Sequence, residues 1–177
     1  MLSYNVAALL RSAPGTARTY HVSLPTMPIA EDVTLAAPVE GDVQLQRTGR
    51  SILARGHVAT AFVEPCARCL KDTTAPVEAE FEEEALPSID IDSGLPVDTS
   101  EEPDVLRLDD HHELDLTETV REAISLAEPL VPLCRPDCRG LCLECGADLN
   151  ADPGHHHDDD AIDPRLAALR ALRDTLD

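Results

Sequence analysis

Four cysteines within twelve residues constrain this chain more than any other feature of its sequence; they are Cys134, Cys138, Cys142 and Cys145. The last two belong to a Cys-x-x-Cys-Gly turn, in which backbone amides can support two thiolates. The amino terminus has no secretory-signal pattern, so we expect a cytoplasmic protein whose thiols stay reduced. The spacing therefore predicts that these four thiolates form a structural zinc site, with free thiols as the alternative.

Two further groups of candidate ligands lie outside this cluster. Cys66 and Cys69 have the spacing of a second half-site, and they could join the cluster or lie apart from it. His155 and His157 belong to a histidine tract that follows the cluster. They could add imidazole ligands or belong to an exposed polar loop.

The charge of the chain limits its partners. There are 34 acidic and 14 basic side chains, which give a formal net charge of −20. This charge excludes a protein that binds nucleic acid by neutralising phosphates over its whole surface, and it disfavours adsorption to anionic membranes. No apolar run approaches the ~20 residues that a membrane span needs.

The amino-terminal part of the chain, residues 1–85, has the pattern of an antiparallel β-rich region. Val43 and Leu45 alternate with polar residues, Thr48-Gly49 suggests a turn, and the alternation resumes from Ile52 to Val58. The stretch 77–82 alternates cleanly between apolar and acidic residues. This alternation predicts half-buried strands with an acidic solvent face. Because only 2% of the residues are aromatic, the core must consist of Leu, Val, Ala and Ile.

The rest of the chain divides into two further regions. Residues 86–114 are acidic and poor in apolar side chains, which is typical of a flexible linker. Residues 115–177 hold a helix that begins at Asp115 and ends before Pro129, the cysteine-rich segment, and a second helix from Asp163. We therefore expect an α+β fold, in which an antiparallel β-rich body is joined to two short helices that flank a cysteine-rich, zinc-knuckle-like segment.

No catalytic constellation is recognisable in the sequence. It contains no Gly-rich phosphate loop, no Gly-x-Ser-x-Gly elbow and no His-Glu-x-x-His helix, so we expect a protein that is not an enzyme. Two alternatives use the cysteines themselves. Cys66 and Cys69 could act as a thiol redox pair, or the cysteine pairs could serve in zinc handling.

The ordered set of motifs resembles the large ribosomal RNA subunit accumulation protein family, also called the YceD family. The resemblance rests on residues 64–70 (EPCARCL), 128–134 (EPLVPLC), 138–150 (CRGLCLECGADLN) and 162–169 (IDPRLAAL). It covers most of the chain, from about Tyr4 to Leu172. The histidine tract and the arginine-rich, lysine-poor composition look like the actinobacterial branch of the family.

The resemblance implies a role in the synthesis, processing or stability of 23S ribosomal RNA, and therefore in assembly of the large ribosomal subunit. It implies no known enzymatic activity. Because the chain is acidic, we expect it to reach a large-subunit precursor through a basic ribosomal protein or an assembly factor. Direct contact with RNA stays open, since it would require that the basic residues of the strand region share one face: Arg47, Arg50, Arg55, Arg68 and Lys71.

Overall fold

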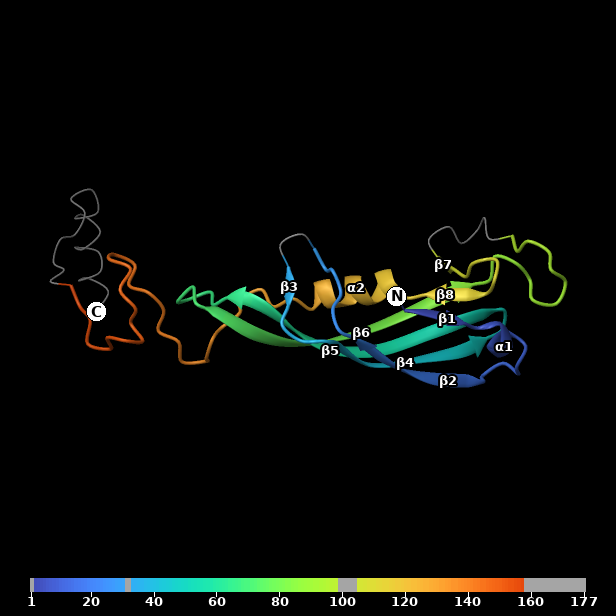
Figure 1. Ribbon diagram of the computed structural model, residues 1–177, viewed down its shortest axis with the longest axis horizontal. Coiled ribbons are helices and arrows are strands. Elements are labelled where there is room, and N and C mark those ends of the chain that lie inside the picture. The colour runs from blue at the N-terminus through green and yellow to red at the C-terminus, as the bar shows by residue number, and fades with distance from the viewer. Residues whose placement is uncertain (1, 31–32, 99–104, 158–177) are drawn as a thin grey trace, which may run out of the picture.

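The computed structural model describes residues 2–30, 33–98 and 105–157 of the chain. The molecule is elongated, with a twisted sheet in its middle and the cysteine-rich segment at one end (Figure 1). Its elements are β1 (Ser3–Asn5), α1 (Ala7–Leu10), β2 (Ala17–Leu24), β3 (Thr34–Leu35), β4 (Val39–Thr48), β5 (Ser51–Pro65), β6 (Asp72–Leu86), β7 (Leu106–Arg107), β8 (Glu113–Asp115) and α2 (Thr117–Leu126). The predicted α+β class with an antiparallel β-rich body is confirmed.

One sheet forms the body, with the strand order β2-β4-β5-β6-β7. Its neighbours pair antiparallel, apart from the short parallel contact between β6 and β7. Strands β5 and β6 form a hairpin that is paired from Ile52↔Ala85 to Pro65↔Asp72. At about 3.3 Å per residue, each 15-residue strand of this hairpin spans about 50 Å. The tip of the hairpin therefore extends beyond β4, toward the cysteine-rich segment (Figure 1).

The two faces of the sheet differ as the alternation predicts. Helix α2 lies on the apolar face (Figure 1), where Val120 and Ile124 are fully buried with side chains from the strands. The opposite face is exposed and mostly acidic, because every second residue of the strands points to solvent. The acidic side chains on this outer face are Glu40, Asp42, Glu78, Glu80 and Glu82.

Glycine allows close packing at two places in the sheet. A Cβ added at Gly41 would lie 2.1 Å from the carbonyl oxygen of His57 on the neighbouring strand. A Cβ added at Gly56 would lie 2.1 Å from the ring of Phe81, so this ring packs directly over the glycine backbone.

Several described residues of the range 86–114 are packed against the body. Strand β7 pairs with β6, Leu108 is fully buried, and Leu114 of β8 pairs with Tyr4 of β1. These apolar residues interrupt an otherwise acidic stretch, which explains how part of it can pack. The linker assignment and the domain boundaries stay predictions.

The predicted helix before the cysteines is confirmed as α2. It begins at Thr117 and not at Asp115, because Asp115 still pairs in β8 and Leu116 is the N-cap residue. The carboxylate of Asp115 accepts a hydrogen bond from the backbone N–H of Thr117 at 2.8 Å at this junction. The helix predicted from Asp163 lies outside the described residues. Among the described residues, no helix is long and apolar enough to cross a membrane.

Candidate metal centres at the hairpin tip

The turn between β5 and β6 presents Cys66 and Cys69 at the tip of the hairpin. The backbone N–H of Cys66 donates to the carbonyl of Lys71 at 2.8 Å, and the N–H of Leu70 donates to the carbonyl of Cys66 at 2.9 Å. Leu70 has a left-handed backbone (φ 59°), which a leucine adopts only where its surroundings hold it there. This tight turn holds both thiols in one loop.

The segment after α2 brings Cys134 and Cys138 to the same place. Two hydrogen bonds dock this segment on the turn: the N–H of Ala67 donates to the carbonyl of Pro132, and the guanidinium of Arg68 donates to the carbonyl of Cys138. The Sγ atoms are 3.9 Å apart between Cys66 and Cys138, and 3.7 Å apart between Cys69 and Cys134. We call Cys66, Cys69, Cys134 and Cys138 the inner centre.

The inner centre has the dimensions of a tetrahedral four-thiolate site. Its four sulfur atoms all lie within 4.8 Å of one another. Zn–S bonds of about 2.3 Å would place sulfur atoms about 3.8 Å apart, close to the two distances above. Cys66, Cys69 and Cys138 are buried, whereas Cys134 is exposed.

Backbone and side-chain groups shift the pKa values of two thiols of the inner centre. Backbone hydrogen bonds, chiefly from Cys134 and Cys69, lower the pKa of Cys66 to about 6. Burial and hydrogen bonds shared with the neighbouring thiols raise the pKa of Cys134 to about 12. The amide of Asn150 donates to the sulfur of Cys138 at 3.5 Å. Four thiolates this close repel one another, so a cation is needed for all four to be deprotonated together.

A second group of ligand atoms lies on the next turn of the chain. We call Cys142, Cys145, His155 and His157 the outer centre; their ligand atoms also lie within 4.8 Å of one another. The Nε2 atoms of the two histidines are 2.9 Å apart. Each contacts one sulfur, at 3.1 Å between His157 and Cys142 and at 3.2 Å between His155 and Cys145. Two thiols and two imidazoles are a common ligand set of zinc.

The outer turn is built around Gly146, whose left-handed backbone (φ 75°) suits a glycine. Its N–H donates to the carbonyl of Cys142 at 2.9 Å, and the N–H of Cys142 donates to the carbonyl of Ala147 at 2.8 Å. Backbone amides of Cys145 and Glu144 are the main cause that lowers the pKa of Cys142 to about 6. The turn therefore favours a thiolate at this position.

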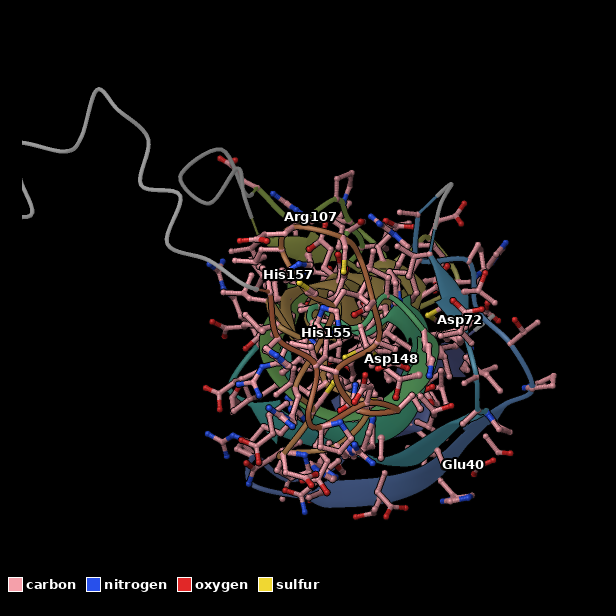
Figure 2. All side chains as sticks on the ribbon, turned by 90° about the vertical axis from the view of Figure 1, so that its left-hand side faces the viewer. Glu40, Asp72, Arg107, Asp148, His155 and His157 are labelled. Carbon is pink, nitrogen blue, oxygen red and sulfur yellow. The ribbon has the colours of Figure 1, made fainter. Side chains whose placement is uncertain are left out.

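Carboxylates lie near both histidines of the outer centre, and the closer one faces His157. The Nδ1 atom of His157 lies 3.4 Å from Glu144, and that of His155 lies 4.0 Å from Asp152. At His157 the carboxylate is close enough to hold a proton on Nδ1, so that the lone pair of Nε2 is directed at a metal. Figure 2 views the molecule from the tip, where both histidines are labelled.

The two centres are joined through the hairpin turn. The N–H of Leu141 donates to the carbonyl of Arg68 at 3.1 Å, and Gly140 packs so closely on Arg68 that a Cβ would lie 2.8 Å from this carbonyl. The ammonium of Lys71 lies 2.6 Å from the carboxylate of Asp148 and is the main cause that holds the pKa of Asp148 well below its usual range. The outer turn therefore rests on the loop that carries the inner centre.

All eight predicted ligands lie at the tip, but the structure groups them differently from the sequence-based prediction. It separates Cys134 and Cys138 from Cys142 and Cys145, and pairs them with Cys66 and Cys69 instead. Gly140, with a left-handed backbone (φ 79°), stands between the two pairs. The role of these residues as metal ligands stays a prediction.

Sequence reasoning did not single out the residues that support the ligands, namely Asn150, Asp152 and Glu144. The contacts of Asn150 and Asp152 form only in the folded tip, so local pattern does not mark them. Glu144 stands between the two cysteines of the outer turn, which is the one signal that could have found it. His156 belongs to the same tract as the ligands, yet its Nδ1 atom faces the carbonyl of Gly154 at 3.2 Å.

The basic residues of the strand region do not gather on one face. Arg47 and Arg50 lie at the turn between β4 and β5, whereas Arg68 and Lys71 lie at the opposite end of β5. Arg55 lies between these ends and pairs with Glu82 at 2.5 Å. The condition for a joint basic patch is therefore not met by these five residues.

Comparison with known proteins gives a family and several relatives. Residues 54–173 match the family described as "Large ribosomal RNA subunit accumulation protein YceD". An uncharacterized protein of Mycobacterium tuberculosis is 38% identical over 129 residues, which cover 72% of this chain and 58% of that protein. A similar protein of Mycobacterium leprae is 35% identical over 134 residues, 75% of this chain and 58% of that protein. These mycobacterial relatives agree with the actinobacterial branch suggested by the sequence.

A plant protein extends the comparison. The "Large ribosomal RNA subunit accumulation protein YCED homolog 1, chloroplastic" of Arabidopsis thaliana is 27% identical over 164 residues, which cover 79% of this chain and 51% of that protein. The chain thus spans a little over half the length of the curated relatives it matches. No solved structure matches the chain.

Proposed function

The chain belongs to the large ribosomal RNA subunit accumulation protein YceD family, and from this premise we propose that it supports the accumulation of 23S ribosomal RNA and assembly of the large ribosomal subunit. The observation that carries the proposal is the family match over residues 54–173. This range includes most of the long hairpin and both cysteine pairs of the inner centre. Ribosome assembly also places the site of action in the cytoplasm.

The protein acts by binding and not by catalysis. Its cysteines and histidines form two sets of four ligand atoms, which is the arrangement of structural metal sites. Zinc is the ion that suits thiolate and imidazole ligands, and its role here is to stabilise the tip. This role agrees with a scaffold that presents surfaces to a partner.

The partner that meets the body is a basic ribosomal protein or assembly factor on the large-subunit precursor. The outer face of the sheet offers five exposed carboxylates on β4 and β6, the two strands that flank β5, and the chain as a whole carries a charge of −20. An acidic surface repels the RNA backbone and attracts basic protein segments. The outer face is therefore the part of the body that guides this encounter.

The first test is depletion of the protein in its own host. We expect the ratio of 23S to 16S ribosomal RNA to fall, and the intact gene supplied in trans to restore it. An unchanged ratio, together with normal ribosomal subunit profiles, would contradict the proposed function.

The second test concerns the outer face. Sedimentation in a density gradient at low salt should place the protein with large-subunit precursors, and the triple variant Glu78→Gln/Glu80→Gln/Glu82→Gln should shift it toward the top. The matched control Asp92→Asn/Asp110→Asn/Glu122→Gln removes the same number of charges from exposed positions elsewhere and should sediment like the parent. If both variants lose co-sedimentation with the precursors to the same extent, a specific role of the outer face is rejected.

A further inference from the structure

The tip of the hairpin contains two complete ligand sets, and we propose that it binds two zinc ions with unequal access to solvent. The inner centre of four cysteines holds a shielded ion. The outer centre of Cys142, Cys145, His155 and His157 holds an exposed ion that exchanges more readily. This inference concerns the metal chemistry of the tip and does not depend on the ribosomal role.

The number of ligands requires two ions. A structural zinc ion takes four protein ligands, and each set supplies four ligand atoms within 4.8 Å of one another. The chain between Cys138 and Cys142 turns at Gly140, which separates the two sets. Neither set has fewer than four ligands, so neither leaves a position for a reactive water, and both ions are structural.

The two centres differ in charge. A zinc ion with four thiolates carries two negative charges in excess, whereas an ion with two thiolates and two neutral imidazoles is neutral. The inner centre has groups that offset its excess: the backbone hydrogen bonds to Cys66, the amide of Asn150 on Cys138, and the nearby ammonium of Lys71. The outer centre has no excess charge to offset, and Glu144 lies where it can orient His157.

The two centres also differ in burial. Three of the inner cysteines are buried, and Leu133 packs against them. In the outer centre Cys145 and His157 are exposed, and the other two ligands are only partly covered. A chelator in solution therefore reaches the outer ion first. The outer turn packs on Arg68, in the loop that carries the inner centre. The outer centre therefore depends on the inner one being folded.

The experiment measures zinc content and zinc ligands on the purified full chain. We expect two zinc ions per chain by native mass spectrometry. X-ray absorption at the zinc edge should give an average of three sulfurs and one nitrogen per ion, because the two sets together contain six cysteines and two histidines. A single ion with four sulfurs would overturn the proposal.

Variants separate the two centres. His155→Ala/His157→Ala should reduce the zinc content from two to one and leave a site of sulfur ligands alone. His156→Ala is the matched control, since this histidine lies in the same tract but outside the ligand set, and it should keep both ions. If the double variant keeps two ions with the parent's ligand average, the outer centre is refuted.

Access is tested on the parent protein, which avoids variants that fail to fold. A mild chelator that changes colour with zinc should remove one ion quickly and the second at least tenfold more slowly. The double variant His155→Ala/His157→Ala should lack the fast phase. A single phase that releases both ions at one rate would overturn the unequal access.

Discussion

The body and the tip of this molecule are held together by different forces. The body buries a continuous set of aliphatic side chains between the sheet and α2, among them Leu45, Val58 and Ile124. At the tip, the buried cluster consists of three cysteines with Leu133 packed against it. Large apolar side chains at the tip and in the segment that leads to it are exposed instead, namely Leu70, Leu130, Val131 and Leu143.

This difference shows why the cysteines are concentrated where they are. Burial of apolar area stabilises the body by the usual hydrophobic effect, whereas the tip has too little of it to offset the cost of ordering its loops. Metal ligation can replace that missing burial.

Removal of metal from the full chain should unfold the tip and leave the body intact. Structural zinc contributes roughly 10–16 kcal/mol of apparent binding energy in small sites, so a strong chelator should abolish the hydrogen-exchange protection of the Ala67 and Leu141 amides. The amides of β4 that pair with β5 should keep their protection. Equal protection of the tip with and without chelator would contradict this division.

Truncation of a core side chain should destabilise the body and leave the tip intact. Leu45 is fully buried, so Leu45→Ala should lower the free energy of unfolding of the body by about 2–5 kcal/mol. Urea denaturation followed by circular dichroism measures this change. Zinc content in the absence of urea should stay as in the parent, and a loss of zinc would show that the two regions depend on each other.

A methyl group at Gly41 should disturb the contact between two strands. Its Cβ would lie 2.1 Å from the carbonyl oxygen of His57, so β4 and β5 must move apart, and we expect a loss of about 1–3 kcal/mol in the same urea assay. The control is Gly154→Ala, where the nearest atom to the new Cβ is a carboxylate oxygen of Asp152 at 3.8 Å. The control should unfold like the parent.

Loss of a surface ion pair should have the smallest effect. Arg55 and Glu82 are both more than half exposed, so Glu82→Gln should change the free energy of unfolding by less than about 1 kcal/mol. The change should shrink further in high salt, because exposed charges are screened. A larger, salt-independent loss would mean that the pair supports the packing of the hairpin.

The sequence predicts the body better than the tip, for a physical reason. The alternation of residues 77–82 is local, and it correctly predicts a strand with an acidic face in β6. The apolar face of α2 is local as well, with Val120 and Ile124 buried as expected. The motifs likewise led to the family that the comparison confirms.

The grouping of the cysteines depends on contacts between distant parts of the chain. Spacing within residues 134–145 favours a single cluster of four, and nothing in that spacing reveals that a hairpin of two 15-residue strands carries Cys66 and Cys69 to the same place. The role of the histidines was open for a similar reason. Only the folded outer turn brings their Nε2 atoms to the sulfurs of Cys142 and Cys145.

The inner centre has a consequence for the topology of the chain. Cys69 and Cys134 are 65 positions apart, so a shared ion closes a ring that contains β6, β7, β8 and α2. Closing a ring of this size costs conformational entropy that grows only slowly with its length. An ion captured before the sheet forms would make the ends of this ring neighbours from the start, and would shorten the search by which β6 and α2 find each other.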